Sequence, residues 1–199
     1  MRKTDTGFDE LAAYRYGSFA LTGVNDPEQV AALAITANTF SMLGVQPLIG
    51  RPFTADEVER KDRVVILSHE FWQRRFMGDR SIVGRAITLS DAPYVVVGVM
   101  PSSFRFPMND DNIDAWAPLI FNTGDLTGRR SHSLTVIGRL RNGVTRDVAT
   151  KQLGDLAKRI ADLDTTSNPE ISVIPAQESL VGDVRSGLMV LFGTVGLVL

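Results

Sequence analysis

Apolar residues are spaced along this chain in two ways, one typical of a helix and the other typical of strands. In one segment they recur at spacings of 4, 3, 4 and 3 residues, which is the period of a helix with one apolar face. The residues of this face are Ala149, Leu153, Leu156, Ile160 and Leu163. The pair Asn142-Gly143 before them favours a tight turn and Thr145 can cap, so the pattern predicts an amphipathic helix that begins near Thr145.

Shorter runs are typical of β-strands. Val64–Leu67 is a continuous apolar run suited to a buried strand, and Ser68 can cap a following helix that runs through Phe76 and ends near Gly78. Ile113–Leu119 alternates apolar and polar residues well enough for an edge strand. The other segments with strand patterns are Tyr16–Thr22, Gln29–Ile35, Gly84–Leu89, Tyr94–Met100, His132–Leu140 and Ile171–Ile174.

Some of these segments allow a second interpretation or carry further detail. Gln29–Ile35 is rich in alanine, so a helix remains an alternative there. Ser90–Pro93 has turn chemistry and predicts a hairpin between the two strands that flank it. In the last long strand, Leu134, Val136 and Leu140 are expected on one side.

Short helices are also expected near the start of the chain. Phe8–Tyr14 could form one, with Phe8, Leu11 and Ala12 on one side. A second short helix is expected to be capped by Asn38 and ended by Gly44, and Thr54 can cap a third. The apolar side of the second helix would be Phe40, Met42 and Leu43.

The mixture of hairpins, short helices and a strand, helix, strand unit from 132 to 174 predicts a mixed fold, α/β or α+β, which we take as α+β. We interpret the middle of the chain, roughly 63–130, as an insertion between two outer pieces that pack together.

The final stretch, 186–199, carries no charge. A bilayer needs about 20 apolar residues of helix, and a run of about 10 to 14 is more often a buried core element. Glycines such as Gly193 and Gly196 weaken a helix in water but let helices approach closely in lipid, so we expect the truncated start of a transmembrane helix, with a core segment as the alternative. Its apolar residues are Leu188, Met189, Val190, Leu191, Phe192, Val195, Leu197, Val198 and Leu199.

Composition narrows the classes of function. Among 199 residues, 21 Lys and Arg stand against 23 Asp and Glu, so the net charge of -2 gives no electrostatic case for nucleic acid. The absence of cysteine excludes disulfides, thiolate nucleophiles and zinc sites built on Cys. No apolar run follows the basic pair at the start, so no signal peptide is visible.

Candidate catalytic and metal-binding residues are few. The chain has no phosphate-binding P-loop, no dinucleotide fingerprint, no zinc-protease motif and no G-x-S-x-G, and its only histidines are His69 and His132. Ser68, His69 and Glu70 are adjacent at a helix start, where side chains diverge, so a capping or surface His69 is favoured over a triad. We therefore expect no catalytic residue and no cofactor.

Other polar and aromatic groups suggest weaker hypotheses. Asp110, Asp111 and Asp114 could bind calcium, but the calcium-loop pattern is missing, so a solvated loop and no metal are expected. Phe104, Arg105 and Phe106 lie in a proline-bracketed loop and would form a partner-contact patch if both aromatics are exposed, the alternative being that they cover the core. Four arginines form a modest basic cluster that reads as a solvated face. They are Arg129, Arg130, Arg139 and Arg141.

Several ordered motifs resemble one family, the MacB-like periplasmic core domain of FtsX/MacB-type ABC transporter permeases. The resemblance covers nearly all of the chain and includes the apolar tail as the start of the second membrane helix. The segments that carry it are Ile35–Phe53, Val64–Trp72, Gly78-Asp79, Ile82–Arg85, Tyr94–Pro101 and His132–Arg141.

The resemblance implies an extracytoplasmic domain at 1–185, inserted between two transmembrane helices and followed by a membrane segment at 186–199. It implies a porter-like lobe of about 8–60 plus 132–178 and a smaller inserted lobe of about 63–130. Members of the family form dimers in the inner membrane and work with a cytoplasmic ABC ATPase. They move substrates such as macrolides, peptides or lipoproteins, some of them together with a periplasmic adaptor.

Three hypotheses of function follow. The first is a non-enzymatic periplasmic domain that couples ATP-driven motion of membrane helices to substrate efflux or to a periplasmic partner. The second is a soluble ligand-binding or scaffold domain whose apolar tail is a core element. The third, the least favoured, is a hydrolase that uses His69 or His132.

Overall fold

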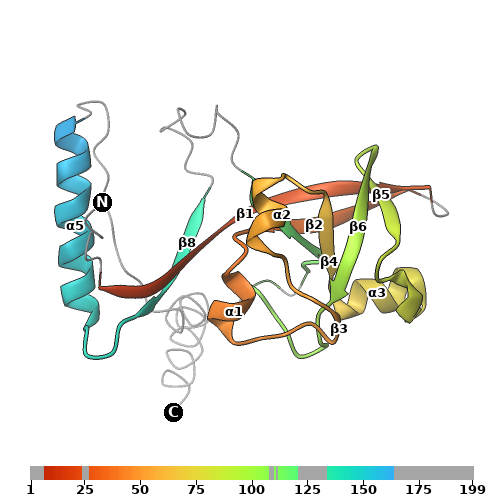
Figure 1. The fold of residues 1–199 in the computed structure, drawn as a ribbon, viewed down its shortest axis with the longest axis horizontal. Helices are drawn as coiled ribbons and strands as arrows, with labels where there is room; N and C mark the ends of the chain where they lie inside the picture. Colours follow the sequence, from red (N-terminus) through yellow and green to blue (C-terminus); the bar gives the residue numbers. More distant parts are fainter. Residues whose placement is uncertain (1–6, 24–26, 108–109, 111, 121–133, 164–199) are drawn as a thin grey trace, which may run out of the picture. The chain divides into compact units, whose positions relative to one another are not determined.

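The structure is a computed structural model that describes residues 7–23, 27–107, 110, 112–120 and 134–163 (Figure 1). They belong to two compact units. The sheet unit comprises the described parts of Met1–Phe104 and Asn112–Val144, and the helical unit comprises those of Arg105–Asp111 and Thr145–Leu199.

The sheet unit contains all the described strands and the short helices. Its strands are β1 (Phe8–Thr22), β2 (Glu28–Ile35), β3 (Ile49–Gly50), β4 (Val64–Leu67), β5 (Ala86–Leu89), β6 (Ala92–Val99), β7 (Ala115–Pro118) and β8 (Thr135–Leu140). Its helices are α1 (Thr39–Leu43), α2 (Ala55–Glu59), α3 (His69–Phe76) and the 3-10 helix η1 (Arg80–Ile82). The helical unit contains α5 (Arg146–Leu163).

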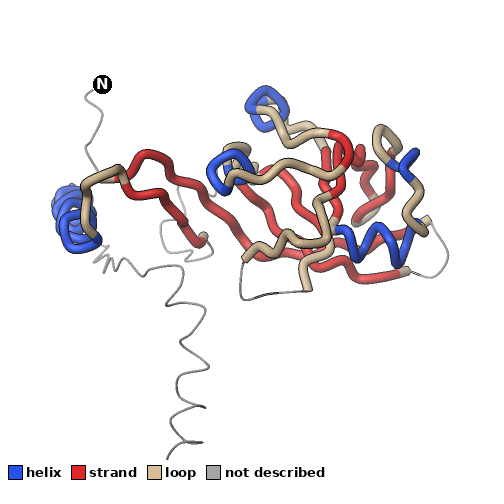
Figure 2. The backbone as a smooth tube through the Cα atoms, turned by 90° about the horizontal axis from the view of Figure 1, so that it is seen from below, coloured by secondary structure: helices blue, strands red, loops and turns tan. Residues whose placement is uncertain are grey.

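The strands form one mixed sheet that closes on itself. The order is β2-β7-β4-β6-β5-β1-β8, with β3 beside β6, and β1 also pairs with β2. Pairing is parallel between β2 and β7 and between β4 and β6, and antiparallel elsewhere. Figure 2 shows the strands of the sheet unit grouped together, with the short helices around them. The expected α+β class is confirmed.

The longest strand corrects one prediction. Phe8–Tyr14, expected as a helix, is the first half of β1, because its backbone pairs with β8 from Phe8↔Leu140 to Tyr14↔Thr135. Side chains alternate accordingly, with Leu11 43% exposed and Ala12 2% exposed, although a helix would have placed them on one side. A helix of so few residues is marginal by itself, so pairing between strands decides the conformation. The expected strand at 16–22 is confirmed as the second half of β1.

A second correction concerns β7. An edge strand was expected at 113–119, but β7 lies between β2 and β4 and all four of its residues are buried. Pro118 is tolerated there because it ends the strand, and Leu119 continues the pairing by donating its amide to the carbonyl of Ile35 at 2.7 Å. The strand alternative for 29–35 is confirmed as β2, and the helix alternative is excluded.

The core lies around β4 and α3, as the apolar run at Val64–Leu67 predicts. All four residues of β4 are buried, and Phe71 and Trp72 of α3 are 0% and 5% exposed. Ser68 caps α3, its hydroxyl oxygen accepting a hydrogen bond from the amide of Phe71 at 3.1 Å. Each fully buried side chain of this size contributes about 1.5–3 kcal/mol.

The predicted first short helix is confirmed, but its cap is not. Asn38 precedes α1 without capping it and instead donates its side-chain amide to the carbonyl of Leu11 at 2.9 Å, which ties α1 to β1. Gly44 ends the helix in the left-handed conformation, as expected. The expected cap at Thr54 is confirmed, and it forms a capping box with Glu57 at the start of α2.

The hairpin between β5 and β6 is confirmed with a shorter turn than expected. Leu89 pairs with Ala92, so the turn consists of Ser90 and Asp91, both with positive φ. Two residues with positive φ give the turn a twist that matches the twist of the strands.

In the helical unit, the amphipathic helix is confirmed. The amide of Val148 donates to the hydroxyl of Thr145 at 3.4 Å at the start of α5, and Ala149 on the predicted apolar face is 0% exposed.

The strand expected at 171–174 and the membrane segment expected at 186–199 lie outside the described residues. Within the described residues, no helix has the length and apolar character needed to cross a membrane. Strands from both expected lobes belong to the one sheet, and the boundaries of those lobes stay a prediction.

Candidate functional site

The residues that follow α3 form one wall of a surface hollow. The helix ends at Phe76, and Met77 adopts a left-handed backbone conformation with φ 52°. Its amide donates to the carbonyls of Trp72 and Gln73, so the terminal carbonyls of α3 are satisfied. This reversal of the chain leaves the Met77 side chain 90% exposed.

A short hydrogen-bonded turn holds the next residues. The carboxylate of Asp79 accepts hydrogen bonds from the amide of Ser81 at 2.9 Å and from its hydroxyl at 2.7 Å. These two bonds keep the pKa of Asp79 below its ordinary value. The carbonyl of Asp79 accepts a bond from the indole of Trp72 at 2.9 Å, which fixes this turn to α3.

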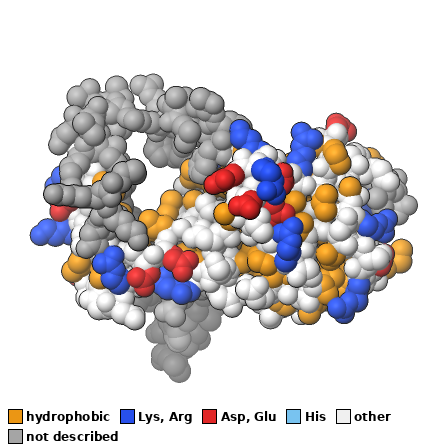
Figure 3. Space-filling view, in the orientation of Figure 1, with side chains coloured by type: hydrophobic (Ala, Val, Ile, Leu, Met, Phe, Trp, Pro, Cys, Tyr) orange, Lys and Arg blue, Asp and Glu red, His pale blue; other side chains and the backbone are white. Residues whose placement is uncertain are grey.

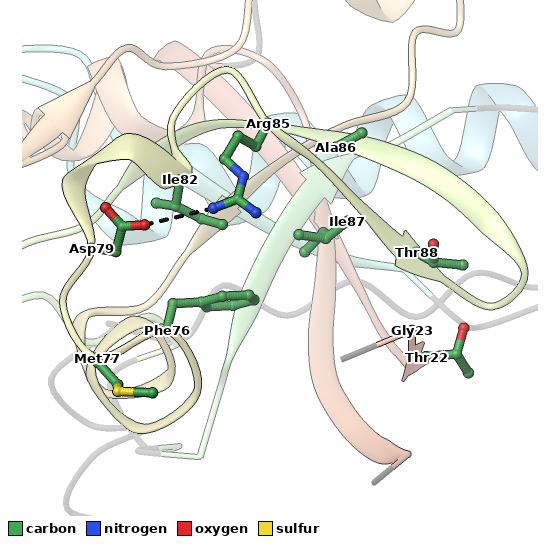
Figure 4. Close-up of a pocket in the computed structure, with 10 residues that line it drawn as sticks. All are labelled: Thr22, Gly23, Phe76, Met77, Asp79, Ile82, Arg85, Ala86, Ile87 and Thr88. Carbon is green, nitrogen blue, oxygen red and sulfur yellow. Dashed lines mark ion pairs between the residues drawn. The ribbon is translucent and has the colours of Figure 1, made fainter. Parts of the chain in front are cut away.

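The hollow lies between the end of α3, η1, strand β5 and the end of β1, and its volume is 570 Å³ (Figure 4). Phe76 is partly exposed inside it, whereas Ile82 and Ile87 lie behind it in the core and are 2% and 6% exposed. Thr22 and Thr88 add hydroxyl groups at the other side.

Arg85 is the cation of the hollow. Its guanidinium group lies near Ile82 (Figure 4). One terminal nitrogen lies 3.6 Å from a carboxylate oxygen of Asp79, and both side chains are at least half exposed, at 63% and 50%. Such an exposed pair is weak, so the guanidinium keeps most of its hydrogen-bonding capacity for another anion.

The chemistry of this lining suits binding rather than catalysis. The described lining residues include one carboxylate, that of Asp79, and no histidine or lysine. Acid–base catalysis needs paired titratable groups at hydrogen-bonding distance from a substrate.

The histidine hypotheses find no support in the described residues. His69 is the first residue of α3, and its ring contacts Trp72 edge to face with centroids 5.7 Å apart. The hydroxyl of Ser68 is engaged as the helix cap. His132 lies outside the described residues.

The calcium hypothesis meets a competing ion pair. The carboxylate of Asp114 receives the guanidinium of Arg74 at 3.0 Å and the amide of Ala31 at 3.1 Å. Arg74 also pairs with Glu28 at 3.0 Å, so these charges tie α3 to β2 and to the residue before β7. Asp111 lies outside the described residues, within which no cluster of three metal-ligating side chains occurs.

The loop expected to contact a partner has two buried aromatic side chains. Phe104 and Phe106 are 9% and 5% exposed, and of the three residues only Arg105 is exposed. Phe104 packs against Phe40 and Trp116, with ring centroids 5.8 and 5.3 Å away. Phe104 therefore covers the core of the sheet unit, and a partner contact at this loop stays a prediction.

The basic cluster is divided among separate contacts. Arg139 donates to the carbonyl of Met42, and Arg141 lies 3.8 Å from a carboxylate oxygen of Asp9. Arg129 and Arg130 lie outside the described residues. On the face shown in Figure 3, basic and acidic side chains are interspersed, which is typical of a solvated surface.

Sequence reasoning missed the hollow. Eight of its ten lining residues lie within 76–88, and the other two, Thr22 and Gly23, join them through the pairing of β1 with β5. The one local signal is Met77, a residue with a large apolar side chain directly before the glycine expected to end the helix.

Solved structures with a similar fold include domains of transporters. The periplasmic region of MacB from Actinobacillus actinomycetemcomitans superposes with a TM-score of 0.59 at 20% identity, covering 78% of this chain and 68% of that chain. The extracellular domain of the noncanonic ABC-type transporter YknZ from Gram-positive bacteria gives a TM-score of 0.62 at 16% identity, covering 87% of this chain and 84% of that one. At these identities the likeness shows a shared fold.

The sequence profile of the MacB-like periplasmic core domain matches residues 2–156, so the chain belongs to this family. The resemblance drawn from the motifs is thereby confirmed. The domain is an extracytoplasmic part of a MacB/FtsX-like ABC transporter permease. The family is described as a periplasmic core domain, and the two solved relatives are a periplasmic region and an extracellular domain of transporters.

Curated relatives are much longer than this chain. The macrolide export ATP-binding/permease protein MacB of Burkholderia pseudomallei is 29% identical over 117 residues, which cover 59% of this chain and 18% of that protein. The protein MacB 1 of Yersinia pestis is 26% identical over 137 residues, covering 69% of this chain and 21% of that protein. The aligned segments thus span about a fifth of the length of these relatives.

Proposed function

We propose that this domain relays ATP-driven movement of membrane helices to the periplasmic side, where the movement drives substrate efflux or acts on a periplasmic partner. The observation that carries the proposal is the family match over residues 2–156. The parent protein would be a permease of the inner membrane that works with a cytoplasmic ABC ATPase, on the same chain or on another. Macrolides are the first substrates to test, because the curated relatives are named for their export.

The closed sheet supports a mechanical role. β1 spans 15 residues and pairs with β2, β5 and β8, so one continuous strand links three others. At about 3.3 Å per residue such a strand is about 50 Å long. Because densely packed interiors deform little, a displacement applied at one strand would move the whole sheet unit.

A dimer, a membrane anchor and an adaptor complete the proposal. Two copies of the parent permease would place two of these domains side by side outside the membrane. The apolar stretch 186–199 would be the start of the following membrane helix. A periplasmic adaptor would contact the domain from the side away from the membrane.

Distance measurements on the full-length permease test the coupling. A spin label at Glu59→Cys, an exposed site on α2, reports the separation of the two domains in a dimer once other cysteines of the parent protein are replaced. ATP is expected to change this separation compared with ADP. An equal distance between the two labels in ATP and in ADP would refute the coupling. If no distance between two labels can be measured, the dimer would be refuted.

A second pair of labels provides the control. Glu59→Cys and Asp91→Cys place two labels within one sheet unit, at α2 and at the β5–β6 turn. Their separation is expected to stay constant, because the sheet unit moves as a body.

Protease cleavage of the domain in spheroplasts of the full-length protein, from outside only, would support the inner-membrane location.

A further inference from the structure

Strand β1 changes its pairing partner along one edge. Its first half, Phe8–Tyr14, pairs with β8, whereas its last residues, Leu21 and Thr22, pair with β5. The first half of β1 and the whole of β8 form a two-stranded β1–β8 ribbon, from which β1 continues into the rest of the sheet (Figure 1). Gly17 lies between the two pairings, and a glycine inside a strand weakens it because it has no side chain to pack. The ribbon is therefore easiest to bend, relative to the rest of the sheet, around Gly17.

Helix α1 is attached to the β1–β8 ribbon by a residue that does not cap its own helix. Asn38 has a side chain of the type that favours caps, yet it makes no capping bond to α1. Its side-chain amide donates instead to the carbonyl of Leu11 at 2.9 Å. The carbonyl of Ala13, two residues later, accepts from the backbone amide of Thr36 at 3.0 Å. Asn38 thus adds one more bond to β1 where the backbone after β2 has turned into α1.

A second attachment comes from the other strand of the ribbon. The guanidinium of Arg139 on β8 donates to the carbonyl of Met42 in α1. A cation at the end of a helix is favourable, since the last carbonyls have no partner within the helix. One short helix therefore holds both strands of the ribbon.

The same helix is fixed in the core of the rest of the sheet. Phe40 of α1 is 0% exposed. The rings of Phe53, Phe104 and Trp116 surround it, with centroids 5.8, 5.8 and 6.3 Å away. Because such a cluster is densely packed, Phe40 has little freedom to shift. Helix α1 therefore connects the ribbon to the core independently of β1.

We propose that α1 is a brace that keeps the β1–β8 ribbon from bending around Gly17, with Asn38 and Arg139 as its positioning residues. Without the brace, a displacement applied to the ribbon is absorbed by bending. With it, the displacement passes through Phe40 to the rest of the sheet. The use of the brace in the relay of movement rests on the function proposed above, whereas the brace itself is a property of the sheet unit.

Spin labels on the ribbon and on the rest of the sheet unit measure the bending by pulsed EPR. The chain contains no cysteine, so Val136→Cys on β8 and Glu59→Cys on α2, both at exposed positions, carry the only two labels. Asn38→Asp keeps the shape of the side chain but removes the N–H donor. The distance distribution is expected to be about twofold broader in Asn38→Asp and in Arg139→Gln, since each loses one of two attachments. An unchanged width in either variant would overturn the attachment at two points.

Two matched variants control for the loss of a polar group. Ser41→Ala removes a hydroxyl that donates to the carbonyl of Asn38 at 2.9 Å, beside α1 itself. Arg141→Gln removes a guanidinium that lies 3.8 Å from a carboxylate oxygen of Asp9. Neither contact joins α1 to the ribbon, so the native width is expected in both. Broadening as large as that of Arg139→Gln would refute the specific role of the brace.

A second pair of labels separates bending from a general loss of stability. Glu59→Cys and Arg80→Cys both lie outside the ribbon, at exposed positions on α2 and η1. Their distance distribution is expected to stay the same in Asn38→Asp and in Arg139→Gln. Equal broadening of both label pairs would mean that the whole sheet unit has loosened, and the brace would be overturned.

Gly17→Ala locates the point of bending. A Cβ atom at this position would meet only the carbonyl oxygen of Ala32, at an ordinary contact distance of 3.9 Å, so β1 is expected to accept it. Alanine has less backbone freedom than glycine, so this substitution is expected to bring the broad distribution of Asn38→Asp back toward the native width. If the distribution stays equally broad, Gly17 is not the point of bending.

These outcomes are separate from those that test the relay of movement. The labels report on the chain without any ATPase, so a failure to broaden overturns the brace and leaves the relay intact. In the full-length permease, Asn38→Asp is expected to reduce the ATP-dependent change in the distance between two Glu59→Cys labels. An equal change with and without Asn38→Asp would overturn the use of the brace in the relay. If the native permease shows no ATP-dependent change, the relay fails while the brace stands.

Discussion

Glu57 is a buried carboxylate, 5% exposed, whose hydrogen bonds join the β3 region to α2. Its two oxygens accept from the guanidinium of Arg51 at 2.9 and 2.6 Å. One of them also accepts from the amide of Thr54 at 2.9 Å, as part of the capping box. Hydrogen bonds to charged groups are worth more than neutral ones, so this residue is a sensitive point of the fold.

Replacement of Glu57 by Gln is expected to lower the free energy of unfolding by about 1.5–3 kcal/mol, because it removes the charge but keeps the shape. Urea unfolding measures this loss. Glu59→Gln is the matched control, since Glu59 is exposed on the same helix, and its effect is expected to be within about 0.5 kcal/mol. Similar losses for the two variants would show that the buried pair contributes nothing specific.

The contribution of Glu57 to the free energy of unfolding is expected to depend on pH. The bonds from Arg51, and then those from Thr54, lower the pKa of Glu57 from 4.5 to about 2 in the folded chain. A lowered folded pKa means that the stabilisation is fully present above the unfolded pKa and is lost as pH falls toward the folded one. The stability difference between the native chain and Glu57→Gln is therefore expected to be constant above about pH 5.5 and to shrink between about pH 4.5 and 2. A difference that stays constant through this window would contradict the assignment.

At the scale of elements, β3 depends on a glycine at its point of closest approach to β6. Gly50 pairs with Gly98 and has φ +82°. A Cβ atom there would lie 2.7 Å from the Cα of Gly98 and still closer to the carbonyl oxygen of Val97. Both the backbone conformation and the space therefore require glycine.

Gly50→Ala is expected to destabilise the chain by about 3 kcal/mol or more, because a clash with backbone adds to the cost of a left-handed alanine. Gly44→Ala separates the two terms. Gly44 has φ +70° but nothing within 4 Å of its added Cβ, so a loss of about 1 kcal/mol is expected. Thermal unfolding of both variants gives the comparison, and a Gly50→Ala variant no less stable than Gly44→Ala would show that β3 moves away without cost.

Sequence patterns predicted elements whose cause is local and failed where a distant partner decides. Ser68 and Thr54 cap the helices after them, as their types indicate, because a cap acts within three residues. The prediction of a helix for the first half of β1 was wrong, because the conformation there is set by pairing with β8, which lies more than a hundred residues later. The prediction that β7 is an edge strand was also wrong. The alternation of apolar and polar residues along one strand does not show how many other strands pair with it.

At the scale of the whole molecule, the closure of the sheet was beyond prediction from the sequence. Closure depends on the parallel pairs β2–β7 and β4–β6, whose partners are separated along the chain by other elements. The hollow was missed because its two walls, 76–88 and Thr22-Gly23, are joined by the distant pairing of β1 with β5. The family, in contrast, could be recognised, because several of its motifs are local segments that keep their order along the chain.

The division between the folded domain and its apolar tail gives the last prediction. Every described strand of the sheet lies before residue 141, and the main core cluster is formed by residues between Leu21 and Ala115. A chain that ends at Arg185 keeps all of these residues and loses the uncharged stretch 186–199. Its unfolding is therefore expected to stay cooperative, with a midpoint within about 2 °C of the longer chain, as measured by circular dichroism. Its solubility without detergent is expected to rise, because a large exposed apolar segment promotes association. Loss of cooperative unfolding in the shorter chain would instead mean that the stretch packs in the core, and the membrane assignment of 186–199 would be wrong.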